Sequence, residues 1–313
     1  MNLKLVHFLH HQRYLGLTDL AFSDSLQNYC LHATWTSIAT QILVVGLFAS
    51  SLVAAAVDSL YYMDTNSQTG NAFDRAVILT ASVSQLLANL WFRSQQDSQV
   101  ILLQRLSKLV GRLHCESLVM CSPRWLYCIW LVVSVLYGSM VAHFGMNWIE
   151  DMQLSRLLTL LGFVARCILA NFQYTCYTSM VLVLQRLLRI QAEQLEGLVS
   201  SASISAADLA ACLRAHDEIL LLGQRELVAV YGGVVLFLLL YQVMQCVLIL
   251  YVSNLEGFHS VQELVFILIW LAPMVFYLSL PLVANEVLKQ CHRFRWNIKC
   301  EASSRYLRSI YLS

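Results

Sequence analysis

Residues 227–253 read LVAVYGGVVLFLLLYQVMQCVLILYVS, a run of 27 residues without a single Asp, Glu, Lys or Arg. At a rise of about 1.5 Å per helical residue, such a run is about 40 Å long and exceeds the hydrocarbon core of a bilayer, which is about 30 Å thick. A helix satisfies its own backbone polar groups where no water is present. This stretch therefore predicts a transmembrane helix.

Five further stretches have the same character, and a single charge, Arg166, interrupts them. They are residues 35–57, 76–92, 125–146, 157–184 and 264–285. The sequence therefore predicts an all-α membrane protein, a polytopic helical bundle with six spans. We expect residues 1–313 to form a single transmembrane domain that ends in a tail at residues 286–313.

The composition agrees with a chain that lies in lipid. Hydrophobic residues make up 58% of the chain and charged residues 12%, which is about half the charged fraction of a typical soluble protein. The same figures exclude a disordered chain. The formal net charge is +1 and the basic residues are scattered, which excludes nucleic acid as a partner. The lipid bilayer is the partner that the composition implies.

The basic residues predict the orientation of the spans. When the six spans alternate across the membrane, 17 of the 20 Lys and Arg residues fall on one side. The loops of the opposite side hold Arg75 and Arg156 together with several acidic residues. Because basic residues stay cytoplasmic in short loops, we expect a cytoplasmic N-terminus and a cytoplasmic C-terminus. The first 34 residues show neither the apolar core nor the cleavage site of a signal peptide.

Two long inner loops, residues 93–124 and 185–226, follow a helical pattern. In the first of them, leucines recur at helical spacing opposite basic residues, at Leu102, Leu106, Leu109 and Leu113. We expect these loops to prolong spans three and four into the cytosol as helices. Such helices either pack on one another or assemble with neighbouring subunits.

Polar residues gather in one half of the predicted bundle. Arg166 lies ten residues into its span, so that it either faces a water-filled cavity or extends its guanidinium to the interface. The other polar or aromatic positions in this half are Gln85, His143, Asn171, Gln173, Tyr174, Tyr241, Gln242, Gln245, Trp270 and Tyr277. Each alone is typical of an interhelical hydrogen bond, and together they predict an aromatic-lined pocket for a small organic ligand.

Catalytic chemistry finds no support in the sequence. The motifs H-E-x-x-H, G-x-S-x-G and the P-loop are absent, and the six predicted spans contain no Asp or Glu. No C-x-x-C spacing indicates a metal site among the 10 cysteines. We therefore expect no enzyme activity, no catalytic residue, no metal and no cofactor. The lack of buried acids also argues against proton-coupled transport.

The layout of the chain resembles the insect gustatory receptors, which belong to the seven-helix insect chemoreceptor superfamily. The resemblance rests on the inside N-terminus, the short acidic outer loops, the helical inner loops, and the passage of span four into CYTSMVLVLQRLLRIQAEQLEGL at residues 176–198. It covers the whole chain in layout. The family signature of span seven, T-Y followed by five apolar residues and Q-F, is absent. The basic stretch from Lys289 to Arg308 matches the segment that precedes that span, so we expect a chain that lacks the seventh, pore-lining helix.

The resemblance implies a tastant-gated cation channel subunit. Such a subunit would form homo- or hetero-tetramers with other gustatory receptors in the plasma membrane of gustatory neuron dendrites. Its ligand would be a small-molecule tastant, and by position the ligand-binding residues would be Arg166, Gln173, Tyr174, Gln242 and Trp270. Two other functions stay open at this point, a small-molecule membrane transporter and a structural membrane protein that is not a channel.

Overall fold

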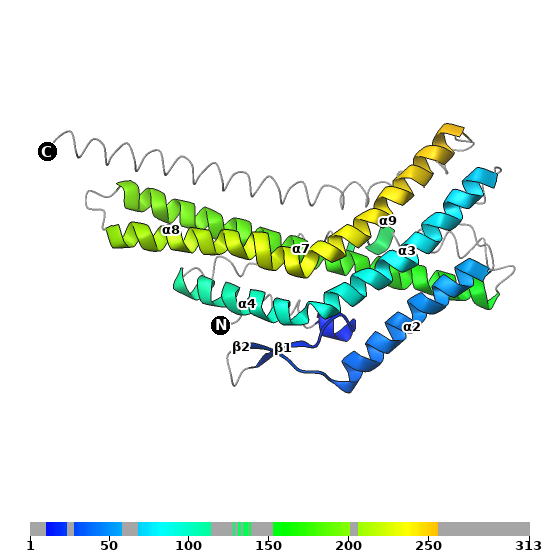
Figure 1. Cartoon of the computed structure of the whole chain (residues 1–313), viewed down its shortest axis with the longest axis horizontal. Helices are drawn as coiled ribbons and strands as arrows, with labels where there is room; N and C mark the ends of the chain where they lie inside the picture. The colour runs from blue at the N-terminus through cyan, green and yellow to red at the C-terminus, as the bar shows by residue number, and fades with distance from the viewer. Residues whose placement is uncertain are drawn as a thin grey trace.

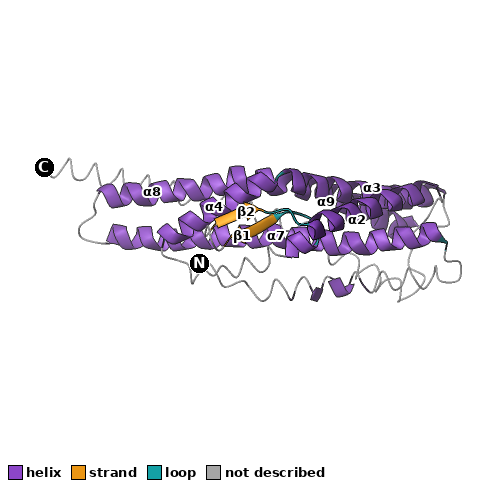
Figure 2. Cartoon of the chain, turned by 90° about the horizontal axis from the view of Figure 1, so that it is seen from below, coloured by secondary structure: helices purple, strands orange, loops and turns teal. Residues whose placement is uncertain are grey.

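The computed structural model describes residues 11–23, 28–57, 68–113, 128, 131–132, 134–136, 138, 153–200 and 206–255. These residues form an elongated helical bundle with a small sheet at its side (Figures 1 and 2). The helical elements are α2 (Trp35–Val57), α3 (Gln68–Ser94), α4 (Gln96–Arg112), α7 (Leu154–Ser200), α8 (Ala206–Leu221), the π-helical turn η2 (Leu222–Leu227) and α9 (Val228–Leu255).

Four of these helical stretches are long and apolar enough to cross a membrane, which agrees with an all-α membrane protein. Helix α2 has the bounds predicted for the first span, and α9 covers residues 228–255 against the predicted 227–253. Helix α7 contains the predicted span 157–184 and continues to Ser200. The predicted span 264–285 and the tail 286–313 lie outside the described residues, and only scattered residues of the span 125–146 are described.

Helix α3 is longer than the predicted span 76–92, because it begins at Gln68. The additional turns contain Asp74, whose side chain is fully buried. The helix of the second span therefore contains an acidic residue, two positions before the predicted span begins. Next to it, Nη2 of Arg75 donates to the carbonyl oxygen of Ala56 at 2.5 Å. That carbonyl lies in the last turn of α2, where helical carbonyls lack a backbone partner and a cation is favourable.

The helix predicted in the first inner loop is present as α4. Its leucines Leu102, Leu106 and Leu109 are buried, as their spacing predicts. A single residue, Gln95, separates α3 from α4, so that this helix prolongs the second span. Our expectation that it would extend the third span is thus wrong, because leucine spacing predicts a helix without showing which span it continues.

Helices α3 and α9 run antiparallel and side by side. The rings of Phe73 and Tyr251 lie 5.4 Å apart at one end of the pair, and those of Phe92 and Tyr231 lie 5.5 Å apart near the other. After the two ends of α2, we call these the Val57 end and the Trp35 end of the bundle. Helices α4 and α8 and the last part of α7 continue beyond the Trp35 end (Figure 1). An apolar cluster of Val77, Ala81, Tyr241 and Leu248 fills the space between the two helices towards the Val57 end.

A small antiparallel sheet precedes α2, which the all-α prediction did not include. Strand β1 (Leu20–Ser23) pairs with β2 (Asn28–Leu31), so that Leu20 faces Leu31. The sheet lies against α4 (Figure 1), where Nε2 of Gln104 donates to the carbonyl oxygen of Tyr29 at 3.0 Å. The N-terminal segment is therefore part of the folded bundle.

Tyr29 provides a first testable prediction. Its side chain is buried, its hydroxyl has no hydrogen-bond partner among the described residues, and burial raises the pKa of the hydroxyl to about 12. The folded state thus holds this proton more tightly than the unfolded state, whose pKa is about 10. The resulting stability is fully present below pH 10 and is lost as the pH rises through 12.

We therefore expect Tyr29→Phe to leave the melting temperature at pH 7.5 unchanged or slightly raised, and to reduce the loss of stability between about pH 10 and pH 12. Thermal melts of the purified protein over that pH range check this. Tyr14→Phe, at a residue that is 73% exposed, is the matched control. A destabilised Tyr29→Phe protein at neutral pH would show that the hydroxyl has a partner.

Candidate functional site: a pocket between three helices

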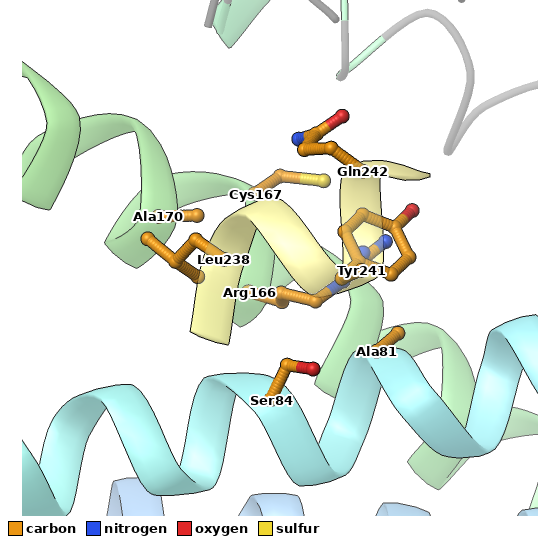
Figure 3. Close-up of a pocket in the computed structure, with 8 residues that line it drawn as sticks. All are labelled: Ala81, Ser84, Arg166, Cys167, Ala170, Leu238, Tyr241 and Gln242. Atoms are coloured by element: carbon orange, nitrogen blue, oxygen red, sulfur yellow. The ribbon is translucent and has the colours of Figure 1, made fainter. Parts of the chain in front are cut away.

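The described residues line a small pocket where α3, α7 and α9 meet (Figure 3). Each helix contributes small or polar residues to the lining. These are Ala81 and Ser84 from α3, Arg166, Cys167 and Ala170 from α7, and Leu238, Tyr241 and Gln242 from α9.

Arg166 provides the charge of the pocket. Its side chain is only 4% exposed, and its guanidinium carbon lies 4.0 Å from the ring centroid of Tyr241 and 4.7 Å from that of Phe163. Figure 3 shows the guanidinium next to the Tyr241 ring. A cation against the face of an aromatic ring is attracted by the negative potential of that face, and the attraction grows when water is excluded. Of the two alternatives for Arg166, the geometry agrees with a residue that faces a cavity.

Several polar atoms of α9 near the pocket lack a hydrogen-bond partner among the described residues. They are Oε1 of Gln242 and both amide atoms of Gln245. Both side chains are at most 2% exposed. Because a buried polar group without a partner is costly, these atoms can stabilise a bound molecule that supplies the missing donors and acceptors.

The pocket is too small in this structure to admit an organic ligand, and we call this state closed. Its volume is about 10 Å³, which is roughly what one water molecule needs. An organic ligand would require a cavity of about 300 Å³ or more. A ligand can therefore enter only if α3, α7 and α9 move apart.

Of the predicted ligand-binding residues, Arg166 and Gln242 line this pocket together. Gln173 does not line it, because its amide is hydrogen-bonded to Gln85 and Asn89 of α3. Tyr174 is 1% exposed and belongs to the main apolar core. Trp270 lies outside the described residues. The hydrogen bonds of Gln173 make it a helix-packing residue in this structure, and two of the five candidate residues, Arg166 and Gln242, line one pocket.

Sequence reasoning missed most of the small residues of the lining. Ala81 and Ser84 lie one turn apart on the buried face of α3, which a helical projection through Gln85 would have found. Ala170 lies one turn from Arg166 on α7 in the same way. Asp74 was also missed, although it lies close enough to act electrostatically on the Tyr241 hydroxyl. Among the described residues, no three His, Cys, Asp or Glu side chains gather as a metal ion would require.

Comparison with known sequences identifies the family. The profile of the 7tm chemosensory receptors matches residues 8–303. Gustatory and pheromone receptor 39a, isoform B, of Drosophila melanogaster is 64% identical over 292 residues, which cover 93% of this chain and 78% of the relative. Isoform C of the same receptor is 21% identical over 294 residues, which cover 90% of this chain and 76% of the relative. These relatives are named as receptors, not as enzymes. The chain belongs to the 7tm chemosensory receptor family.

Proposed function

We infer that this chain is a gustatory receptor subunit that binds a small-molecule tastant in the pocket between α3, α7 and α9 and takes part in a tastant-gated cation channel. The observation that carries this proposal is the buried Arg166, which stacks on Tyr241 inside a closed pocket. The similarity to a receptor named for gustation and pheromones supports it as well.

The orientation that the basic residues predict supports an outward-facing site. It puts the Val57 end of the bundle outside the cell and the Trp35 end inside. Arg166 follows the start of α7 at Leu154 by 12 residues, or about 18 Å along the helix axis. The pocket would then lie in the membrane and be reached from the outer surface or from the lipid.

Binding would use the polar atoms that lack partners in the closed pocket. A ligand that parts the three helices gains hydrogen bonds from Gln242 and Gln245, and contact with the Arg166 guanidinium. Because the pocket is closed without a ligand, binding would favour an arrangement in which the helices are further apart. This differential affinity is what a ligand needs in order to change the state of a channel. The subunits would assemble as homo- or hetero-tetramers with other gustatory receptors in the plasma membrane.

Whole-cell recording tests the function. The chain is expressed in cultured cells alone and together with a full-length relative, and a panel of sugars and bitter alkaloids is applied. A cation current that requires this chain supports the receptor. Uptake of a labelled compound without current would support a transporter instead, and surface expression with neither would leave a structural role.

Substitution of Arg166 is the most direct test of the proposed ligand site. Arg166→Ala removes the guanidinium that would contact the tastant, and a hydrogen bond to a charged group is worth about 2 kcal/mol, so the tastant concentration for half-maximal current should rise about 10- to 30-fold. Arg166→Lys keeps the charge but loses the flat surface that stacks on a ring. The tastant's potency on this variant should therefore lie between its potencies on the wild type and on Arg166→Ala. Surface labelling measures expression in parallel. Arg156→Ala, on the same helix, is the control, and an unchanged potency in Arg166→Ala would remove the arginine from the ligand site.

A further inference from the structure

Two long helical rods of the bundle are interrupted near the Trp35 end. The first rod consists of α3 and α4, which meet at Gln95 with φ −97° and ψ 14°. The side chain of Gln99 crosses this break and donates from Nε2 to the carbonyl oxygen of Phe92 at 3.1 Å. A side chain that binds a helical carbonyl in this way is typical of a bend between two helical segments.

The second rod consists of α8, η2 and α9. Its interruption is the π-helical turn Leu222–Leu227, a feature that often lies at functional sites and bends a helix. Oε1 of Glu226 in this turn accepts a hydrogen bond from Nη1 of Arg105 in α4 at 2.9 Å. Figure 1 shows that both rods change direction in the same part of the bundle. We call the region from Phe92 to Gln99 and from Leu222 to Tyr231 the joint.

The N-terminal segment is buried beside the joint. Residues 12, 17, 18 and 20 are each at most 2% exposed. Nε2 of Gln12 donates to the sulfur of Cys176 in α7 at 3.1 Å, and Gln12 also lies beside the hydroxyl of Tyr231 in α9. Gly16 makes this path possible, because its φ is +68° and a Cβ there would lie 2.7 Å from the backbone nitrogen of Gln41. The segment therefore contacts α2, α7 and α9 at once.

Asp19 fastens this segment to the end of α3. Its Oδ2 lies 2.6 Å from Nη2 of Arg93, and its Oδ1 accepts a hydrogen bond from Oγ of Ser37 at 2.5 Å. The side chains of Arg93 and Asp19 are 19% and 6% exposed, against 59% and 35% for the pair Arg112–Glu218 between α4 and α8. The Asp19–Arg93 pair is thus well shielded from water, which strengthens it relative to a surface pair.

We propose that residues 12–20 are a latch that holds the joint in its bent state, and that the Asp19–Arg93 pair keeps this latch closed. Arg93 lies on the same helix as Ala81 and Ser84 of the pocket, and nine residues separate it from Ser84, or about 14 Å along the axis. A movement of α3 that opens the pocket must therefore move Arg93 against Asp19. The latch is a property of the fold and does not depend on any ligand of the pocket.

Hydrogen exchange tests the latch without a ligand. The full chain is purified in lipid nanodiscs, and amide exchange is followed by mass spectrometry for the wild type, Asp19→Asn and the charge-exchanged pair Asp19→Arg with Arg93→Asp. In Asp19→Asn we expect exchange to rise on the order of tenfold in residues 11–20, 92–99 and 222–231, while α2 beyond Phe48 keeps its rate. The charge-exchanged pair should restore most of the protection.

Arg112→Gln is the matched control, because it breaks an ion pair of the same chemistry that is more exposed, and it should leave the joint at the wild-type rate. If Asp19→Asn does not yield folded protein, Ser37→Ala removes one hydrogen bond from the same carboxylate and should give a smaller rise in the same segments. Faster exchange confined to residues 11–20 would overturn the proposal, because the joint would then not depend on the segment. A uniform rise over the whole chain would overturn it as well, since that indicates general destabilisation.

Discussion

Gly233→Val in α9 should strongly reduce the amount of folded protein, and Trp91→Ala in the same chain should restore much of it. A Cβ built at Gly233 would lie 2.4 Å from the indole of Trp91 in α3, and two further indole atoms lie within 2.7 Å. The indole lies directly against Gly233, so a larger residue collides with it unless the indole moves away. Overpacking of this kind costs about 3 kcal/mol, which should lower the melting temperature by about 5 °C or more.

The control for Gly233→Val is Gly46→Val in α2, where an added Cβ meets no described atom within 4 Å. Both substitutions put a β-branched residue into an apolar helix, so that their difference isolates the contact with Trp91. Melting of the detergent-solubilised protein, followed by size-exclusion chromatography, measures the effect. Equal losses in the two variants would show that helix propensity and not the contact between α3 and α9 decides the result.

The long apolar runs of the sequence predict four of the described helices, because a span needs only length and the absence of charge. The bounds of α2 agree with the prediction, and those of α9 differ by a residue or two. The start of α3 could not be predicted in the same way. Gln68, Asp74 and Arg75 make its first turns polar, which hides them from a search for apolar runs, and the contact of Arg75 with the end of α2 is a tertiary one.

The N-terminal sheet and the joint could not be predicted from local sequence for a related reason. The strands β1 and β2 have four residues each and are stabilised by tertiary contacts with α4. The π-helical turn contains no proline, and its sequence LGQREL is compatible with an ordinary α-helix. Its contact partner Arg105 is 121 residues from Glu226 in the sequence, so no periodicity relates the two.

In the candidate pocket, too, some residues could be predicted from the sequence and others depend on tertiary contacts. Arg166 stands out in the sequence as a charge in an apolar run, and it does line the pocket. Gln173 stands out equally, yet it serves helix packing. The difference depends on which face of α3 lies opposite each residue, and that is a property of the antiparallel pairing of whole helices. A single sequence contains all the polar residues of a bundle but does not show which of them face each other.

Gln173→Leu should destabilise the protein by about 1 to 3 kcal/mol, because it removes two of the three hydrogen bonds that join the buried amides of Gln85, Asn89 and Gln173. Nε2 of Gln85 donates to Oε1 of Gln173 at 3.0 Å, and Nε2 of Gln173 donates to Oδ1 of Asn89 at 2.9 Å. Gln85 and Asn89 are also hydrogen-bonded to each other at 3.0 Å, so that the three amides form a closed triangle between α3 and α7. The melting temperature of the solubilised protein measures the loss.

Two comparisons separate the triangle from a general need for polar groups in the bundle. Gln245→Leu replaces an amide that is equally buried but has no partner among the described residues, so it should be neutral or stabilising. The triple variant Gln85→Leu, Asn89→Val and Gln173→Leu removes all three amides together and should recover much of the stability that Gln173→Leu alone loses, because no buried amide with a lost hydrogen bond remains. A triple variant less stable than the single one would mean that the amides contribute more than the penalty for leaving them unpaired. The triangle would then be a net source of the adhesion between α3 and α7, in a membrane where apolar contacts between helices gain little over contacts with lipid.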